Sequence, residues 1–157
     1  MGVVVRIFRN NDKIDLNETT DVLVSILNKL KYSYSYINKY ISYDEGYNNI
    51  FGTTAPDLID ENGEPEGLCF YVSDKFKSGF EEEYEIIGKE MVTAVFWEDV
   101  GKGPISFLEI IYRYFLKFPN DLFWTDYLVY TKDDIEKIYA HKEKDVWWCC
   151  RKPEYLI

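Results

Sequence analysis

Histidine and cysteine are scarce in this chain, and their scarcity removes several kinds of chemistry. His141 is the single histidine among 157 residues, and the cysteines are Cys69, Cys149 and Cys150. The chain therefore offers few of the side chains that serve as general bases, nucleophiles or zinc ligands. We expect His141 to lie at the surface near the end of a helix. We expect the three thiols to be buried and inert.

Sequence motifs for catalysis are missing as well. No Gly-x-Ser-x-Gly or Ser-x-x-Lys pattern occurs, and Gly101–Gly103 lacks the second half of a phosphate loop. The stretch 57–64 is similar to a calcium loop, but aligning Gly63 with its glycine puts Leu58 and Cys69 where carboxylates are required. We predict no catalytic residue, no metal site and no cofactor, so the chain is not expected to be an enzyme. A weak, irregular calcium site and a metal-dependent hydrolase using the same carboxylates stay as alternatives.

Long apolar runs are also absent. The longest, Ile105–Phe118, is interrupted by Glu109, Arg113 and Lys117, which excludes a transmembrane helix of about 20 apolar residues. No secretory leader is expected, and Arg6 stands where a myristoylation signal needs Ser or Thr. Together with the odd number of cysteines, these features predict a cytoplasmic protein that does not bind membranes.

Aromatic residues, in contrast, are plentiful at 18% of the chain. Such a composition is typical of folded proteins, because disordered segments lack aromatic residues. A chain of 157 residues fits one domain and can bury a core without disulfides. We therefore predict a single globular domain spanning residues 1–157.

Basic residues are nearly absent from one segment, Tyr40–Gly88. It holds twelve carboxylates against two bases, Lys75 and Lys77, whereas the other residues carry sixteen of each sign. The segment thus accounts for the entire net charge of −10. A concentrated negative field attracts basic surfaces and repels nucleic acid and anionic lipid. Acids that served solubility alone would be interspersed with bases.

The first half of the chain has clear periodic patterns. Val3–Phe8 is β-branched and aromatic and predicts a strand. Asp15 is one of several N-cap candidates for a helix, and apolar residues at helical spacing continue in phase from Leu23 to Ile41. This phase favours helix throughout, although a second pattern with the period of a strand is present in Tyr32, Tyr34 and Tyr36.

The acidic segment contains a long stretch without periodicity. We expect 43–67 to be a loop region, because Asp, Glu, Asn, Gly and Pro dominate it; loops of this length are usually functional or disordered. Leu68–Val72 predicts a buried strand. The runs 84–87 and 91–97 flank Gly88, which suits a tight turn, so they predict a hairpin.

The last third of the chain predicts helices separated by short elements. A capping box at Ser106 and Glu109 opens the most apolar helix, which runs to about Lys117. We expect a turn at 120–126, a short strand near 127–130, and a helix starting at Thr131 with Asp134. An edge strand is predicted at 145–150. The mixture favours an α+β fold with a largely antiparallel sheet packed against helices.

Tyrosines accompany the acids, as in many binding surfaces. Phe51 could join such a surface, and Tyr36 and Tyr40 could either join it or pack inward. The turns 97–99 and 124–126, each with a tryptophan beside a carboxylate, offer a second candidate surface. The residues we expect to bind a basic partner are Asp44, Glu45, Tyr47, Asp57, Asp60, Glu61, Glu64 and Glu66.

Size, acidity and the absence of a catalytic constellation make the chain similar, as a class, to the immunity proteins that bacteria produce against polymorphic or contact-dependent toxins. Such proteins bind a cognate toxin domain, often a basic nuclease, and block its active site. The resemblance implies an inhibitor that acts by stoichiometric occlusion. The alternative is an acidic adaptor or assembly subunit that docks on another basic protein. A homo-oligomer is compatible with either function.

Overall fold

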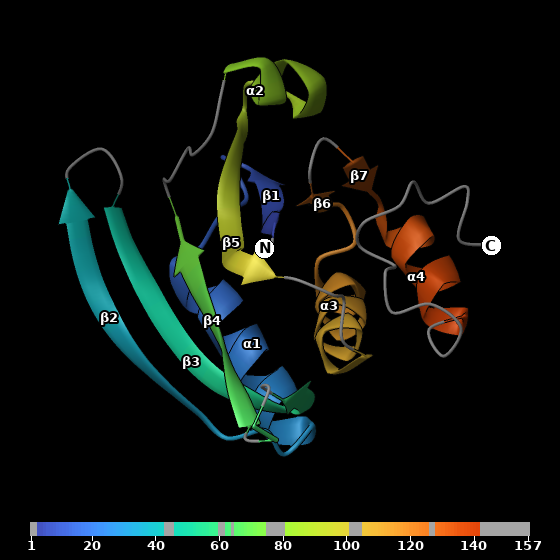
Figure 1. Ribbon diagram of the computed structural model, residues 1–157. Helices are drawn as coiled ribbons and strands as arrows, with labels where there is room; N and C mark the ends of the chain where they lie inside the picture. Colours follow the sequence, from blue (N-terminus) through green and yellow to red (C-terminus); the bar gives the residue numbers. More distant parts are fainter. Residues whose placement is uncertain are drawn as a thin grey trace.

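A computed structural model of the chain describes residues 3–42, 46–59, 62–63, 65–74, 81–100, 105–125 and 128–141. Seven strands and four helices lie within these residues (Figure 1). In chain order they are β1 (Val3–Asn10), α1 (Leu16–Lys29), β2 (Tyr34–Ser42), β3 (Gly46–Ile59), β4 (Pro65–Ser73), α2 (Glu81–Ile87), β5 (Met91–Val100), α3 (Ile105–Lys117), β6 (Leu122–Thr125), β7 (Leu128–Tyr130) and α4 (Lys132–Ala140).

All seven described strands belong to one sheet with the order β2-β3-β4-β5-β1-β6-β7. Every described pairing is antiparallel. β1 lies inside the sheet between β5 and β6, while β2 and β7 form the two edges. The predicted α+β fold with an antiparallel sheet is therefore confirmed.

Helix α1 begins as predicted but ends earlier. Asp15 is its N-cap, and the carboxylate accepts a hydrogen bond from the Glu18 N–H at 3.0 Å. At the other end the N–H groups of Lys31 and Tyr32 donate to the carbonyls of Asn28 and Leu27, and Lys31 has a φ of 60°. This Schellman motif stops the helix without the usual glycine.

The expected continuation of this helix to Ile41 is wrong, because β2 occupies residues 34–42. The alternation of Tyr32, Tyr34 and Tyr36 was the correct signal. Strand pairing with β3 competes successfully with the helical spacing here, since local periodicity is only one contribution to the final structure.

The expected loop at 43–67 is also wrong over most of its length. β3 runs for 14 residues through it, and β4 begins at Pro65. β3 is paired on both sides, to β2 and to β4, and Phe51 stacks on Phe70 with ring centroids 4.9 Å apart. These tertiary contacts outweigh the poor strand propensity of the Asn and Gly residues. Pro56 lies in the irregular stretch between Thr54 and Ile59, where a missing N–H is tolerated.

The predicted hairpin around Gly88 is half correct. β5 forms its second arm, but the first arm is helix α2. Gly88 has a φ of +117° and donates its N–H to the Tyr84 carbonyl at 2.8 Å. The glycine therefore supplies a positive φ as expected, yet it ends a helix rather than turning a hairpin.

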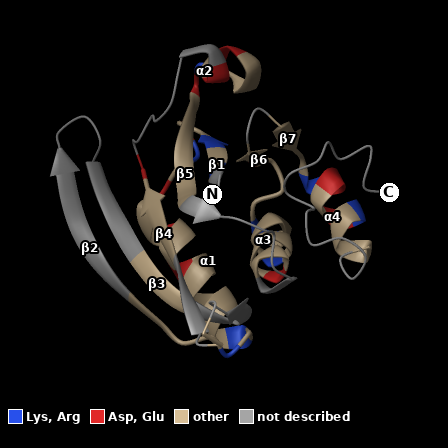
Figure 2. Cartoon of the chain, in the orientation of Figure 1, with Lys and Arg blue, Asp and Glu red and all other residues tan. Residues whose placement is uncertain are grey.

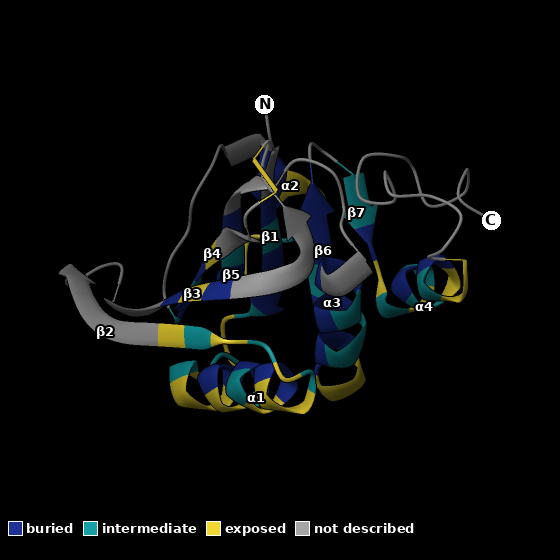
Figure 3. Cartoon of the chain, turned by 60° about the horizontal axis from the view of Figure 1, so that its bottom comes forward, coloured by how far each residue is buried: buried dark blue, intermediate teal, exposed yellow. Residues whose placement is uncertain are grey.

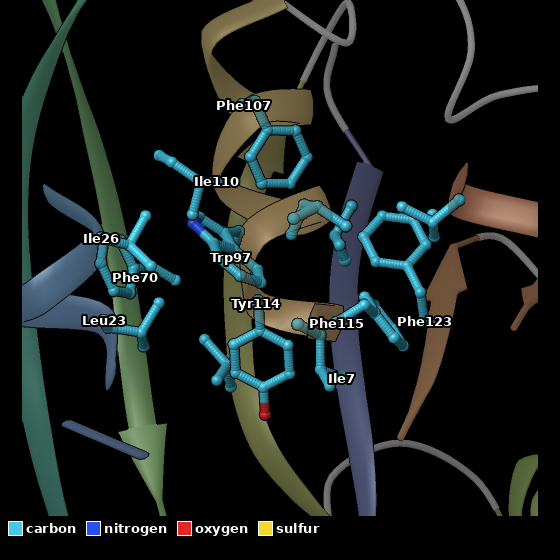
Figure 4. Close-up of a cluster of buried hydrophobic side chains, with 14 of the residues drawn as sticks. Ile7, Leu23, Ile26, Phe70, Trp97, Phe107, Ile110, Tyr114, Phe115 and Phe123 are labelled. Carbon is cyan, nitrogen blue, oxygen red and sulfur yellow. The ribbon is translucent and has the colours of Figure 1, made fainter. Parts of the chain in front are cut away.

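Helix α3 occupies the centre of the main core and confirms the predicted apolar helix, starting one residue earlier at Ile105. Figure 4 shows its side chains directed toward Trp97 of β5, Ile7 of β1 and Phe123 of β6. The Trp97 and Phe107 rings meet edge to face, with centroids 5.1 Å apart. The fully or almost fully buried residues of α3 are Phe107, Leu108, Ile110, Ile111, Tyr114 and Phe115.

The end of the described chain is closer to expectation. α4 starts with the capping box of Thr131 and Asp134, and β7 matches the predicted short strand. The expected turn at 120–126 is wrong in part, since β6 spans 122–125 and pairs with both β1 and β7. The predicted edge strand at 145–150 lies outside the described residues.

The two faces of the sheet are covered differently. α1 and α3 lie on one face, with their exposed positions directed away from the strands (Figure 3). Val5 and Ile7 of β1 point into this main core. Phe8 points to the other face, where it contacts Tyr84 of α2 and Trp124 of β6 in a smaller cluster. α2 therefore closes the second face near β1.

The central position of α3 gives a matched test within one helix. Replacing Leu108, Ile111 or Phe115 with alanine should each lower the free energy of unfolding by about 2–5 kcal/mol, because each deletion leaves a cavity in a close-packed core. Leu116→Ala is the control, since that side chain is 51% exposed, and it should change stability by less than about 0.5 kcal/mol. Chemical denaturation measures all four. Equal, small effects would contradict this core.

Candidate protein-binding surface

The acidic segment forms one end of the sheet. It provides the last residues of β2, all of β3 and β4, and helix α2. Of the eight residues predicted to bind a partner, Tyr47 and Asp57 have their backbone in β3, and Glu66 has its backbone in β4. The other five lie outside the described residues: Asp44, Glu45, Asp60, Glu61 and Glu64.

The strands separate these residues into two groups. Asp44 and Glu45 stand in the sequence between β2 and β3, close to Tyr47. Asp60 to Glu64 stand between β3 and β4, close to Asp57 at the far end of β3. At about 3.3 Å per residue, Tyr47 and Asp57 are roughly 33 Å apart along the strand. The expectation of one continuous acidic loop is therefore corrected to two acidic groups, one near each end of β3.

Glu83 is an acid of the segment that does not face solvent. Its carboxylate accepts from the Arg6 guanidinium, and both side chains are largely buried. This ion pair joins α2 to β1 beneath the smaller cluster. The neighbouring Glu85 is exposed. The negative field outside the protein therefore comes from the exposed acids, and Glu83 serves the fold.

The aromatic residues near the acids have mixed positions. Phe51 is fully buried and packs inward. Tyr34 is partly buried against the main core, with its ring centroid 6.3 Å from that of Phe51. The side chains of Tyr36, Tyr40 and Tyr47 are not among those described.

The second candidate surface, at 97–99 and 124–126, does not present its tryptophans to solvent. Trp97 is fully buried in the main core, and Trp124 is 2% exposed in the smaller cluster. Both tryptophans lie in strands, β5 and β6, where sequence reasoning expected a strand end and a turn. Their size directs them to the interior, because large aromatic side chains dominate core packing.

Charges elsewhere are mixed in sign. Figure 2 shows both acidic and basic residues on α1 and on α4, whereas the coloured residues of α2 are acidic. Lys132 and Glu136 pair on α4 at 2.6 Å, and Arg113 and Glu109 pair on α3 at 3.5 Å. Among the described residues, the excess of acids seen in the sequence thus belongs to the β2-β3-β4 side of the sheet and to α2.

A buried polar network is the strongest cluster of titratable groups among the described residues. The Arg9 Nε donates to the two carboxylate oxygens of Asp121 at 3.2 and 3.1 Å. The other guanidinium nitrogens donate to Thr19 Oγ1 at 2.9 Å and to the Tyr114 hydroxyl at 2.6 Å. Tyr114 in turn donates to Asp121 at 2.7 Å, and the guanidinium lies 3.7 Å from the Phe118 ring centroid.

This network links β1, α1 and the end of α3, and its charges are shielded from water. Burial raises the pKa of Asp121 to about 6, although the nearby Arg9 acts to lower it. Burial also raises the pKa of Tyr114, with a further contribution from Asp121. Arg9 and Asp121 are each only 4% exposed. The role of the network is therefore to hold β1, α1 and the end of α3 in position. Sequence reasoning missed it, since its members are far apart in the chain and follow no motif.

The histidine and the described cysteine both lie at the surface. His141 is the exposed C-cap of α4, as predicted. Cys69 is exposed on β4, which corrects the expectation that it is buried. Cys149 and Cys150 lie outside the described residues. Within the described ranges, no three His, Cys, Asp or Glu side chains come together as metal ligands would.

Two searches beyond the site give no further assignment. Among the helices of the described chain, none has the length and apolarity needed to cross a membrane. Comparisons with protein-family models, curated proteins and solved structures found no match. The charge and geometry of the chain itself must therefore support any proposal on function.

The buried carboxyl of Asp121 predicts a particular pH dependence. Its folded pKa of about 6 lies above the ordinary value of 3.8, so the folded state binds more protons than the unfolded state between about pH 4 and 6. The contribution of Asp121 to stability is therefore greatest at low pH and falls as the pH rises through this window. The free energy of unfolding of wild type, measured by urea denaturation, should therefore fall relative to that of Asp121→Asn as the pH rises from 4 to 7. If it rises instead, the effect of Arg9, which lowers the pKa of Asp121, outweighs the effect of burial, which raises it.

Proposed function

We propose that this protein binds a basic protein domain and inhibits it by occlusion, as immunity proteins inhibit their toxins. The observation that carries the proposal is the coincidence of charge with structure. All of the net charge of −10 comes from Tyr40–Gly88, and this segment contributes a contiguous block at one edge of the sheet, β2-β3-β4, together with α2. The remaining residues are electrically balanced.

Ion pairs among the described residues account for little of this charge. The Arg6–Glu83 ion pair uses one acid of the segment, and the buried Arg9–Asp121 pair uses none. The self-repulsion of clustered carboxylates acts against a compact state. A basic partner would relieve that repulsion on binding, and it would be attracted from a distance because unscreened charges steer encounter.

A nuclease-type domain suits this surface chemically. Such a domain needs a basic cleft to hold phosphates, and the carboxylates of the segment would occupy the same positions in the complex. Occlusion of this kind needs no catalysis by the inhibitor and no cofactor. It requires a stoichiometric complex in the compartment where both proteins are present, which we take to be the cytoplasm.

The separation of the two acidic groups makes the proposal more specific. A standard interface of about 800 Å² per partner is only about 30 Å across, so it reaches one group fully and the other at its margin. The group between β3 and β4 contains five of the eight residues: Asp57, Asp60, Glu61, Glu64 and Glu66. We assign the centre of the interface to this group.

Charge reversal tests this assignment. The triple variant Asp60→Lys, Glu61→Lys and Glu64→Lys should lose protection of cells that express the partner domain, because it places like charges at the interface. The partner to use is a basic domain encoded directly upstream, where an immunity gene follows its toxin gene. Growth rescue is the readout, and a thermal melt of the variant should be unchanged.

A matched control separates local from overall charge. Asp12, Asp21 and Asp133 are exposed acids outside the segment, and their replacement with lysine alters the net charge equally. That variant should still protect. If both variants lose protection equally, net charge alone explains the effect. If both still protect, the binding site is not at this group. Turnover that depends on a divalent cation and is lost only in the first variant would favour a hydrolase.

A further inference from the structure

The free edge of the sheet at β2 suggests how the partner binds. β2 is nine residues long and pairs with β3 on one side only within the described part of the chain. In Figure 1 it lies on the outside of the sheet, far from α4. Its outward N–H and C=O groups form a template on which another extended segment can pair.

β2 has few of the features that normally block such pairing. Natural edge strands are protected by prolines, bulges, charged side chains (lysine especially) or short length. β2 contains no proline and a single charged residue, Lys39, and its one irregularity falls between Tyr40 and Ser42 at the end. Most of its length is therefore regular strand.

Acids stand beyond both ends of β2, in the sequence at one end and along β3 at the other. Asp44 and Glu45 follow β2 directly in the sequence. At the other end β2 begins opposite Thr53, so β3 continues past it toward Asp57 without a β2 neighbour. An incoming strand of the same length would have its two ends near carboxylates and its centre near Lys39.

From this arrangement we infer that β2 accepts an extended segment of the basic partner, added as an eighth strand, with Lys or Arg at its two ends and no basic residue at its centre. The inference rests on the proposed function and specifies the mode of recognition. A second copy of this chain is a poorer occupant. Pairing β2 with itself would bring the acids of both copies together, and like charges in juxtaposition oppose association.

Peptide binding tests the edge without the partner. The probe is a nine-residue peptide, the length of β2, with Arg-Lys at each end and alternating Thr and Val between. Its control has Glu-Glu at each end. The first peptide should slow hydrogen exchange of alternate amides in 34–42 by roughly ten-fold or more, whereas the second should not bind. Absence of binding up to about 1 mM, or protection located elsewhere, would overturn the inference.

Two proline variants provide a control inside the strand. Adjacent residues of an antiparallel strand point their N–H groups to opposite sides, so either Asn38 or Lys39 points away from β3. Asn38→Pro and Lys39→Pro should therefore differ. Proline at the residue whose N–H points outward should leave the melting temperature unchanged and weaken peptide affinity about ten-fold or more. Lys39→Gln controls for the lost charge and should bind normally.

The outcomes separate this inference from the proposed function. If the folded proline variant still binds the peptide and still protects cells, the edge is not the contact, although the inhibitor proposal stands. If wild type protects no cells, the inhibitor proposal itself fails. A dimer of wild type in sedimentation equilibrium that dissociates in the folded proline variant would assign the edge to a second copy.

Discussion

The packing of α3 against β1, β5 and β6 is the constraint on which the rest of the structure depends. These strands lie inside the sheet, and six large side chains of α3 are buried in the main core. α1 and α4 then pack beside α3, while Tyr139 of α4 donates a hydrogen bond to Glu109 at 2.9 Å. This body of helices and inner strands holds most of the core, and β3 and β4 add Phe51, Phe70 and Val72 to it. The acidic segment therefore contributes to the core as well as carrying the excess of charge.

Charges in the two parts of the sheet are balanced differently. Ions inside the body are paired and hydrogen-bonded, as with Arg9 and Asp121. This is the usual condition for a buried charge. The acidic segment differs, since its excess of carboxylates has no matching bases in its own sequence. In the proposed complex, a basic partner supplies the missing positive charge, and the β2 edge offers it a backbone template in addition to an attractive field.

Much of the body could be predicted from the sequence, because its signals are local and agree with one another. Asp15 and Thr131 cap their helices, and the apolar periodicity of α3 matches its buried face. The acidic region was harder. Asn48, Asn49 and Pro56 oppose strand formation locally, so β3 depends on neighbours on both sides. α1 ends at Lys29, and the positive φ that stops it is at Lys31, where a glycine would have signalled the stop. The Arg9–Asp121 pair joins residues 112 positions apart, which no periodicity reveals. The acidic residues themselves were evident, but their division between two ends of β3 required the strands.

The salt dependence of association tests the central claim, that the acidic segment attracts a basic protein. Exposed charges are screened over about 10 Å at 0.1 M salt and about 3 Å at 1 M. Stopped-flow mixing with the purified partner domain should therefore show an association rate constant that falls roughly ten-fold or more as salt rises from about 50 to about 500 mM, while the dissociation rate changes much less. An association rate that is independent of salt would contradict the account and indicate an apolar interface.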